Sequence, residues 1–327
     1  MLEHGGRLLR AARQFGIAPE QWLDLSTGVS PWPWPVPALP ASAWQRLPEE
    51  EDGLAEAAQA YYGAGRLLPV AGSQAAIQAL PQLRARCRVG VIAPGYNEHA
   101  HAWRRAGHEV VSAAAGALQA GADDFDVLVL IHPNNPGGDR FTRECLLDLH
   151  ARLARRGGWL VLDEAFIDAT PEDSLCIHAG RDGLVVLRSV GKFFGMAGAR
   201  AGFVFAMPGL LDALRERLGP WTLSGPARWA VKQALADRDW QAQARPRLLA
   251  GSDELAALLR AHGLTPQGGS AFFQWCVHAD APALHAALAQ RAILTRLFDA
   301  PASLRFGLPA DAAGFRRLEA ALREILQ

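Results

Sequence analysis

Lysine is rare in this protein, and one of its lysines is placed where it could do covalent chemistry. Of the 33 basic residues, 31 are arginine and two are lysine, at positions 192 and 232. An arginine cannot form a Schiff base because its guanidinium stays protonated, whereas a lysine amine can be tuned into a nucleophile. Lys232 lies inside a predicted helix, and we interpret it as an accident of composition. Lys192 ends the motif Ser189-Val190-Gly191-Lys192, which begins just after a predicted strand, and it is the candidate nucleophile.

Further polar residues follow other predicted strands. Asn135 lies in the turn 132–138, after the predicted strand Asp126–Ile131, and Asp163 follows the predicted strand Trp159–Leu162. In open α/β sheets, ligands bind beyond the carboxyl ends of the strands, so we expect these side chains to share one pocket. The remaining candidates are Gly72, Ser73 and Gln74 at the start of a predicted helix, Tyr96 in a turn after the strand Arg88–Ala93, and Arg200, eight residues after Lys192.

These residue types together suit one cofactor, pyridoxal phosphate. The amine of Lys192 can form the Schiff base, and the carboxylate of Asp163 can keep the pyridine nitrogen protonated. The amide of Asn135 can donate to the phenolic oxygen of the ring, and Tyr96 can stack on its outer face. A phosphate group needs a helix start with hydroxyl and guanidinium donors, which Gly72, Ser73, Ser189 and Arg200 offer.

The elements that must position these residues alternate between strands and helices from about residue 66 to 205. Short runs rich in Val, Ile and Leu without clean alternation are typical of a sheet that is covered on both faces. The alternation predicts a large, doubly wound and mainly parallel α/β domain at 46–207. Beyond it we expect a smaller α+β domain at 208–327, with short strands near Ala271–Val277 and Ser303–Gly307. Residues 1–45 are expected to form an arm that packs with the smaller domain; its segment 31–40 holds five prolines and is predicted to be extended.

Each motif alone has a simpler interpretation. The sequence from Asn135 to Gly138 is first of all a turn, and a lone Asp after a strand is often a helix cap. Ser-x-x-Lys also occurs in penicillin-binding enzymes, but the further motifs of that class are absent from the sequence. A nicotinamide-dependent dehydrogenase is disfavoured because no Gly-x-Gly-x-x-Gly follows the first strand. The order and spacing of the motifs, all at strand ends, make coincidence a poor explanation.

As a set, the motifs resemble those of fold-type-I pyridoxal-phosphate enzymes, the class I and II aminotransferases and their relatives. The matching pieces are Asn135-Pro136-x-Gly138, Asp163-x-x-Phe166, Ser189-x-x-Lys192 and Arg200, together with Ser303–Gly307, which resembles the strand that carries the substrate-carboxylate arginine. Four further pieces resemble the threonine-phosphate decarboxylase branch, which serves cobalamin biosynthesis and is similar to histidinol-phosphate aminotransferase. They are His4-Gly5-Gly6-Arg7, Asp24–Pro31, Pro220–Ser224 and Ile293–Arg296.

The resemblance implies roles for individual residues. Lys192 and Asp163 would be catalytic, and the cofactor would be bound by Gly72, Ser73, Gln74, Tyr96, Asn135, Asp163, Phe166, Ser189, Lys192 and Arg200. The substrate would be bound by His4, Gly5, Gly28, Asn135, Arg296 and Arg305, with Arg305 on the carboxylate and Arg296 and His4 near the phosphate. The implied reaction is decarboxylation of L-threonine O-3-phosphate to (R)-1-amino-2-propanol O-2-phosphate.

Two alternatives remain open at this point. An aminotransferase that acts on a phosphorylated amino compound, such as histidinol phosphate, would use the same cofactor site, because only the bond that is aligned for cleavage differs. A non-catalytic relative that binds partners through the same fold is the other alternative; the presence of Lys192, Asp163 and Arg200 argues against it.

Three positions depart from the family pattern. Phe166 stands where many aminotransferases have a Tyr that bonds to the cofactor's phenolic oxygen. Leu47-Pro48-Glu49 stands where many have Tyr-Pro-Asp, whose Tyr reaches the cofactor phosphate of the partner subunit. Gly28 stands where relatives often carry Asn, so one polar contact to the substrate is expected to be missing.

Composition sets the remaining expectations. The 33 acidic and 33 basic residues balance, so we expect neither nucleic acid nor an anionic membrane as a partner. The four cysteines fit no zinc spacing, no metal site is expected, and no stretch reaches the ~20 apolar residues that cross a bilayer. We expect a cytoplasmic enzyme that binds a small phosphorylated amino acid. We also expect a homodimer, because the large aromatic side chains of segment 31–40 would otherwise be exposed to water.

Overall fold

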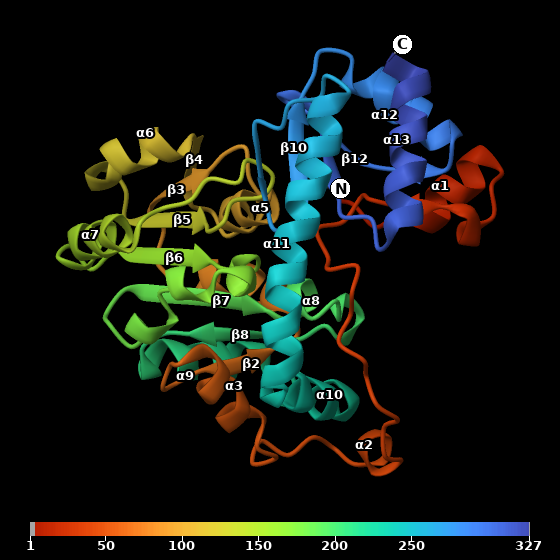
Figure 1. Ribbon diagram of the computed structural model, residues 1–327. Coiled ribbons are helices and arrows are strands. Elements are labelled where there is room, and N and C mark those ends of the chain that lie inside the picture. Colours follow the sequence, from red (N-terminus) through yellow and green to blue (C-terminus); the bar gives the residue numbers. More distant parts are fainter. Residues whose placement is uncertain (1–3, 327) are drawn as a thin grey trace.

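A large mixed sheet forms the centre of the protein, whose computed structural model describes residues 4–326 (Figure 1). Its seven strands have the order β2-β8-β7-β6-β5-β3-β4. All neighbouring pairs are parallel except those made by β8, which runs against both β7 and β2. The strands are β2 (Leu68–Val70), β3 (Arg88–Ile92), β4 (Glu109–Ala113), β5 (Val127–Ile131), β6 (Trp159–Asp163), β7 (Leu184–Ser189) and β8 (Gly202–Phe205).

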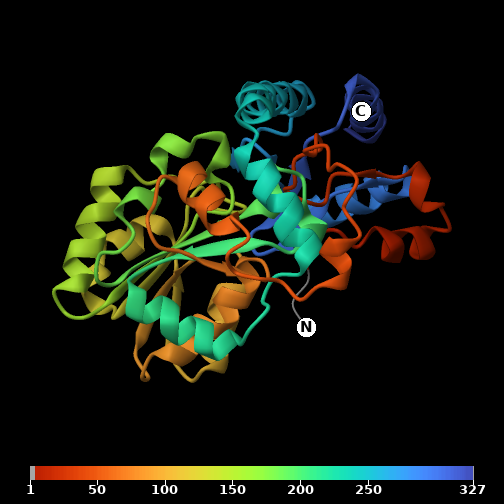
Figure 2. The same cartoon turned by 90° about the horizontal axis from the view of Figure 1, so that it is seen from below.

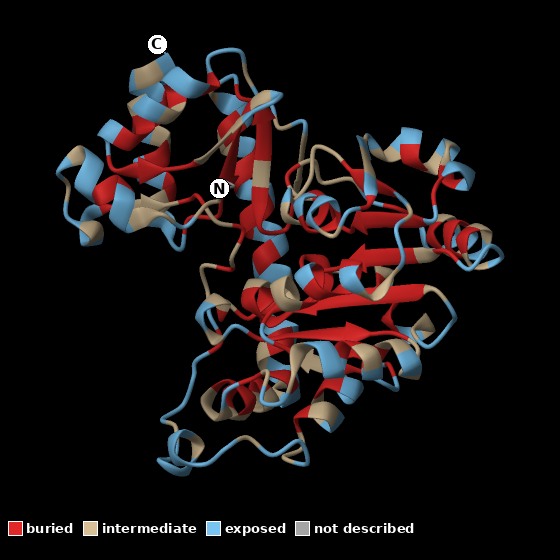
Figure 3. Ribbon diagram, turned by 180° about the vertical axis from the view of Figure 1, so that it is seen from behind, coloured by how far each residue is buried: buried red, intermediate tan, exposed pale blue. Residues whose placement is uncertain are grey.

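The apolar strands are continuous runs because both faces of this sheet are covered. In β5 every residue is buried: Val127 and Val129 belong to one core cluster, whereas Leu128 and Leu130 belong to the other. Figure 2 shows helices above and below the strands, and Figure 3 shows the strands as the buried centre of this part. The helices around the sheet are α3 (Leu54–Tyr62), α4 (Ser73–Ala79), α5 (Glu98–Arg105), α6 (Ala115–Ala120), α7 (Arg143–Ala154), α8 (Val190–Phe193), α9 (Pro208–Leu218) and α10 (Gly225–Ala236).

A smaller antiparallel sheet lies beside the large one and has the order β12-β13-β10-β9. It consists of β9 (Gly268–Ser270), β10 (Phe273–Val277), β12 (Arg296–Asp299) and β13 (Ala302–Gly307), and it is accompanied by α12 (Ala281–Gln290) and α13 (Ala312–Leu326). The helix α11 (Arg238–Ala261) runs between the two sheets in Figure 1. The fold expected from the sequence, a doubly wound sheet with an α+β part, is therefore confirmed.

The N-terminal segment packs with the C-terminal part of the chain. The helix α1 (Leu8–Phe15) shares an apolar cluster with α12, in which Ala11 and Ala12 meet Ala289 and Leu294. The short strand β1 (Leu23–Asp24) pairs in parallel with β11 (Ile293–Leu294). Residues from the two ends of the chain thus pack into one part of the fold.

The Pro-rich segment 31–40 is extended, as predicted, but its tryptophans are at least partly covered by the chain itself. Trp34 is 5% exposed, and its Nε1 donates to Asp237 Oδ2 at 2.9 Å. Trp32 donates from Nε1 to the Ala310 carbonyl at 2.7 Å, and the Arg247 guanidinium lies 4.1 Å from its ring centroid. Trp34 therefore needs no second subunit as cover, whereas Trp32 is partly exposed.

The predicted strands Arg88–Ala93, Asp126–Ile131 and Trp159–Leu162 each differ from β3, β5 and β6 by one residue at one end. The helix α7 begins after Thr142, which is its N-cap because its side chain accepts from the Cys145 amide at 3.2 Å. The strand β2 was not predicted: it is three residues long and contains Pro69. Proline is tolerated there because β2 is an edge strand.

The remaining helices are short. They are α2 (Ser42–Gln45) and the 3-10 turns η1 (Pro19–Gln21), η2 (Leu80–Leu83), η3 (Ala122–Asp124), η4 (Ile167–Ala169), η5 (Pro171–Asp173), η6 (Cys176–His178) and η7 (Ala197–Ala199). Within residues 4–326, none of the helices has the length and apolar character needed to span a bilayer.

Candidate active site

A cavity of about 140 Å³ lies beyond the carboxyl ends of β5, β6 and β7, next to the start of α4. The parallel strands bring their ends to one edge, so residues that are far apart in sequence meet there. All ten residues expected at the cofactor line this cavity: Gly72, Ser73, Gln74, Tyr96, Asn135, Asp163, Phe166, Ser189, Lys192 and Arg200.

Lys192 projects into the cavity from the one-turn helix α8, just after β7. Burial, together with the positive charges of Arg305 and Arg200, lowers the pKa of its amine to about 8, whereas the Asp163 carboxylate opposes this shift. A larger fraction of unprotonated amine near neutral pH makes this nitrogen a better nucleophile. Lys232 does not line the cavity, and its Nζ donates to the carbonyl of Asp52 at 2.8 Å.

Asp163 ends β6 and is 4% exposed. Its Oδ2 lies 2.9 Å from Nε2 of His99, and its Oδ1 accepts from the Ala165 amide at 3.1 Å. His99 is as buried as Asp163, so the pair is shielded from water. The sequence analysis missed His99; the signal that could have found it is its position in the first turn of α5, on the helix that follows the turn with Tyr96.

The other end of the cavity is built to hold an anion. The chain turns sharply at Gly72, where φ is +70°, and a Cβ there would lie 2.7 Å from Nη2 of Arg200. This leaves room only for glycine between the guanidinium and the first turn of α4. Ser73 and Ser189 add hydroxyl groups to the same lining. Backbone N–H groups, hydroxyls and a guanidinium together match the oxygens of a phosphate group.

Tyr96 forms a side wall of the cavity. Burial raises the pKa of its hydroxyl to about 12, with the carboxylates of Glu98 and Asp163 adding to the shift. The protonated hydroxyl donates to Gln74 Oε1 at 3.1 Å, which holds the tyrosine ring against the start of α4.

Arg305 enters the site from β13 of the smaller sheet. Its Nη1 donates to Asn135 Oδ1 at 2.5 Å, and its Nη2 donates to the Ser26 carbonyl at 2.8 Å. Its Nε is buried and has no hydrogen-bond partner among residues 4–326. Burial, together with the positive charge of Arg296, lowers the pKa of this guanidinium to about 9. A bound anion would compensate this buried charge, so the arginine is suited to a carboxylate.

An outer pocket of about 330 Å³ adjoins the inner cavity and shares Tyr96, Asn135 and Lys192 with it. All six residues expected at the substrate line it: His4, Gly5, Gly28, Asn135, Arg296 and Arg305. A third cleft of about 730 Å³ continues outward past His4 and Arg296. The outer pocket and the third cleft share His4, Gly5, Arg296 and Phe298 in their linings.

Steric contacts explain why position 28 is a glycine. A Cβ there would lie 2.9 Å from Cε1 of Phe166 and 2.9 Å from Cδ1 of Phe273. The two rings themselves pack edge to face at 5.2 Å between centroids. An asparagine side chain at position 28 would need both rings to move.

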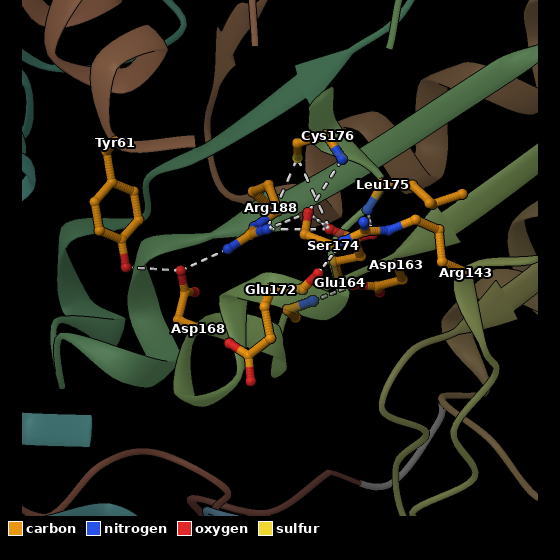
Figure 4. Close-up of polar contacts among 11 residues, drawn as sticks. Tyr61, Arg143, Asp163, Glu164, Asp168, Glu172, Ser174, Leu175, Cys176 and Arg188 are labelled. Carbon is orange, nitrogen blue, oxygen red and sulfur yellow. Dashed lines mark hydrogen bonds and ion pairs between the residues drawn. The ribbon is translucent and has the colours of Figure 1, made fainter. Parts of the chain in front are cut away.

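A buried charge network supports the loop that carries Phe166 (Figure 4). Arg188 of β7 donates to Glu164 Oε2 at 3.0 Å and to Asp168 Oδ1 at 2.6 Å, and the Tyr61 hydroxyl donates to the same Asp168 oxygen at 2.9 Å. Glu164 directly follows Asp163, and Arg188 directly precedes Ser189. Because side chains alternate along a strand, the ion pair lies on the opposite face of the sheet and fixes the backbone behind the site.

The fold and this site define the class of protein, and comparison with known proteins agrees. Residues 45–318 match the family Aminotransferase class I and II, and the chain belongs to that family. The solved histidinol-phosphate aminotransferase from Sinorhizobium meliloti, in complex with pyridoxal-5'-phosphate, has the same fold, with a TM-score of 0.82 at 20% identity over 100% of this chain and 98% of that one. The resemblance to fold-type-I enzymes is therefore confirmed.

Within this family, the chain is similar to two curated threonine-phosphate decarboxylases. The protein of that name from Pseudomonas aeruginosa is 58% identical over 322 residues, which cover 98% of this chain and 97% of the relative. The one from a Sinorhizobium species is 43% identical over 327 residues, with the same coverage of both chains. The branch indicated by the N-terminal motifs is confirmed by this similarity.

Proposed function

We propose that this protein is a pyridoxal-phosphate enzyme that decarboxylates L-threonine O-3-phosphate to (R)-1-amino-2-propanol O-2-phosphate, a step of cobalamin biosynthesis. The observation that carries the proposal is the outer pocket, which joins the lysine amine to two arginines, Arg296 and Arg305, and to His4. A substrate with a carboxylate and a phosphate a few bonds apart needs two cationic centres in one pocket. The names of the two relatives support the same activity.

The residues of the inner cavity fit the cofactor. Lys192 would be the point of covalent attachment, Asp163 with His99 would keep the pyridine nitrogen protonated, and Tyr96 would contact the ring. Gly72, Ser73, Ser189 and Arg200 hold the phosphate. Bound pyridoxal phosphate supplies an electron sink for the pair of electrons that remains on the substrate Cα when CO₂ leaves.

The residues of the chain supply orientation and the proton. Arg305 and Asn135 hold the substrate carboxylate, so they set which bond of the Cα is placed for cleavage. The Cα–carboxylate bond breaks, CO₂ departs, and a proton takes its place on Cα. Lys192 is suited to deliver that proton from Nζ, because an amine with a pKa of about 8 exchanges protons readily near neutral pH.

Phe166 leaves one contact of related sites unfilled. It cannot donate a hydrogen bond to the phenolic oxygen of the cofactor, and its ring centroid lies 5.3 Å from Nζ of Lys192. We assign that hydrogen bond to the Asn135 amide, whose Oδ1 is already occupied by Arg305 and whose nitrogen is therefore the group left to donate.

The proposal also covers the assembly. The proposed division is an arm at 1–45, a cofactor-binding domain at 46–207 and a small domain at 208–327, although α9 and α10 at the start of the last range pack against α4 and α3 of the large domain. The chain works in the cytoplasm as a homodimer. Trp44 is 69%, Leu47 66% and Trp221 58% exposed, which is unusual for large apolar side chains. Trp44 and Trp221 flank the place where α2 meets the start of α10, and this surface is the candidate for the subunit contact.

The test measures whether the substrate loses its carboxylate carbon as CO₂. The purified holoenzyme is incubated with O-phospho-L-threonine, and CO₂ release is measured beside glutamate formation from 2-oxoglutarate and beside an incubation with histidinol phosphate. Stoichiometric CO₂ and aminopropanol phosphate are expected. Amino transfer without CO₂ would instead favour the aminotransferase. Borohydride reduction followed by peptide mapping should find the cofactor on Lys192, and an adduct on Lys232 would contradict the site.

A further inference from the structure

Glu98, the first residue of α5, connects the N-terminal arm with the cofactor cavity. Its Oε1 lies 2.7 Å from Nε2 of His4, and its Oε2 accepts a hydrogen bond of 2.9 Å from Nε2 of Gln74. Gln74 in turn receives the hydrogen bond from Tyr96 described above. The His4 ring lies over Tyr96, with 5.7 Å between the centroids. Glu98 is therefore the central member of a chain of contacts that leads from the cavity wall to the arm.

The carboxylate of Glu98 carries the same negative charge as the substrate anions that the outer pocket is proposed to bind. His4 lines the outer pocket together with Arg296 and Arg305, where the proposed function puts two anions. The Glu98 side chain is only 13% exposed, so water screens its charge incompletely and it should repel a nearby phosphate. Two features stabilise it: its place in the first turn of a helix, and the ion pair that it forms with His4 when the imidazole is protonated.

We propose that Glu98 is a positioning residue that makes the site select phosphorylated substrates, an inference that rests on the proposed function. It holds the imidazole of His4 over Tyr96, at the pocket that Arg296 also lines, so that the ring can donate to a phosphate monoester. Glu98 thus favours phosphate binding by positioning His4. This effect acts against the direct Coulomb repulsion between the Glu98 carboxylate and the phosphate. The residue touches neither substrate nor cofactor in this role.

The backbone of the arm supports the same geometry. The Gly6 amide donates to Ser26 Oγ at 2.8 Å, and a Cβ on Gly5 would lie 2.1 Å from the Ser26 carbonyl oxygen. The chain is thus pressed against the segment that also receives Nη2 of Arg305. Backbone contacts place the arm, and Glu98 places the one imidazole that the arm carries into the pocket.

The two possible roles of Glu98 predict opposite effects of its removal on the binding of the phosphorylated substrate. If it acts through His4, Glu98→Ala should lower kcat/KM for O-phospho-L-threonine about 3- to 10-fold through KM, leave kcat within about twofold, and leave unphosphorylated L-threonine unchanged. Glu98→Gln keeps one acceptor oxygen for His4 and should recover part of the loss. If Glu98 acts only by repulsion, both variants should instead bind the phosphorylated substrate more tightly.

Asp299→Asn is the matched control. Asp299 is another acidic residue that lines the cleft beside His4, so this variant removes one negative charge from the same wall. It should leave the preference for the phosphorylated substrate unchanged or raise it. A loss equal to that of Glu98→Ala would overturn the proposal, because the effect would then belong to any acid of the cleft.

A double-mutant cycle isolates the path through His4. In the His4→Ala background, Glu98→Ala should cause no further loss of kcat/KM, and the release of repulsion should partly restore it. Additive losses would overturn the proposal. The same four proteins are titrated with inorganic phosphate alone by calorimetry on the holoenzyme, which needs no turnover.

This second readout separates the inference from the function. Coupling between His4 and Glu98 in phosphate binding without CO₂ release would keep the inference and refute the decarboxylase. CO₂ release by a Glu98→Ala variant with unchanged substrate preference would keep the decarboxylase and refute the inference.

Discussion

The two arginines of the outer pocket should respond differently to the same substitution. Arg305 is 6% exposed and its guanidinium already holds Asn135, so a carboxylate bound to it is shielded from water. Arg296 is partly exposed at the start of β12 and faces the wider cleft. The register of β12 against β13 pairs Arg296 directly with Arg305, which fixes the separation of the two cationic centres.

The magnitude follows from this difference in exposure. Losing a charged hydrogen bond costs about 1.5–3 kcal/mol, which is roughly a 10- to 150-fold effect. We expect Arg305→Gln to reach the upper part of this range with both O-phospho-L-threonine and L-threonine, since both carry the carboxylate. Arg296→Gln should lower kcat/KM about tenfold for the phosphorylated substrate only, because water replaces part of its contact.

The assay is kcat/KM for CO₂ release with both substrates, with Arg291→Gln as the control. Arg291 precedes β11, is exposed and pairs with Glu324 at 3.0 Å, so this variant removes an equal charge without touching the pocket. It should leave both substrates unaffected. If Arg296→Gln lowers activity on the two substrates by the same factor, Arg296 does not bind the phosphate and the reasoning fails.

Three further predictions concern the cofactor and the assembly. Asp163→Asn should retain the cofactor but slow CO₂ release by about 10²-fold or more, because it removes the carboxylate that pairs with the protonated pyridine nitrogen. Near-normal turnover of this variant would reject the role of Asp163. His99→Asn should give a smaller loss in the same assay. The apoprotein should recombine with pyridoxal phosphate faster as pH rises through about 8, since the Lys192 amine is then unprotonated, and a rate that is flat between pH 7 and 9 in stopped-flow absorbance would contradict the lowered pKa. Light scattering at micromolar concentration should give the mass of a dimer, and Trp44→Asp should shift it toward the monomer; a wild-type monomer would reject the assembly.

The local parts of the site could be predicted from the sequence. The continuous apolar run of Val127–Ile131 indicates a strand covered on both faces, and the polar turn after it carries Asn135 to the edge of the sheet. Lys192 could be singled out because it is one of only two lysines and follows a strand. Such signals survive in a sequence because they depend on neighbours within one strand, one turn or one helix start.

Contacts between distant segments were decided by the tertiary structure alone. His99 meets Asp163 across 64 positions, Glu98 meets His4 across 94, and Arg305 meets Asn135 across 170. Packing also buried Trp34 within the chain, contrary to the expectation that segment 31–40 needs a second subunit as cover, and it left Trp44 exposed. A sequence pattern indicates which side chains can be buried or can form hydrogen bonds, whereas their partners depend on how strands and helices pack. For this reason the sequence indicated the class of chemistry, and the fold decided which groups orient the reacting residues.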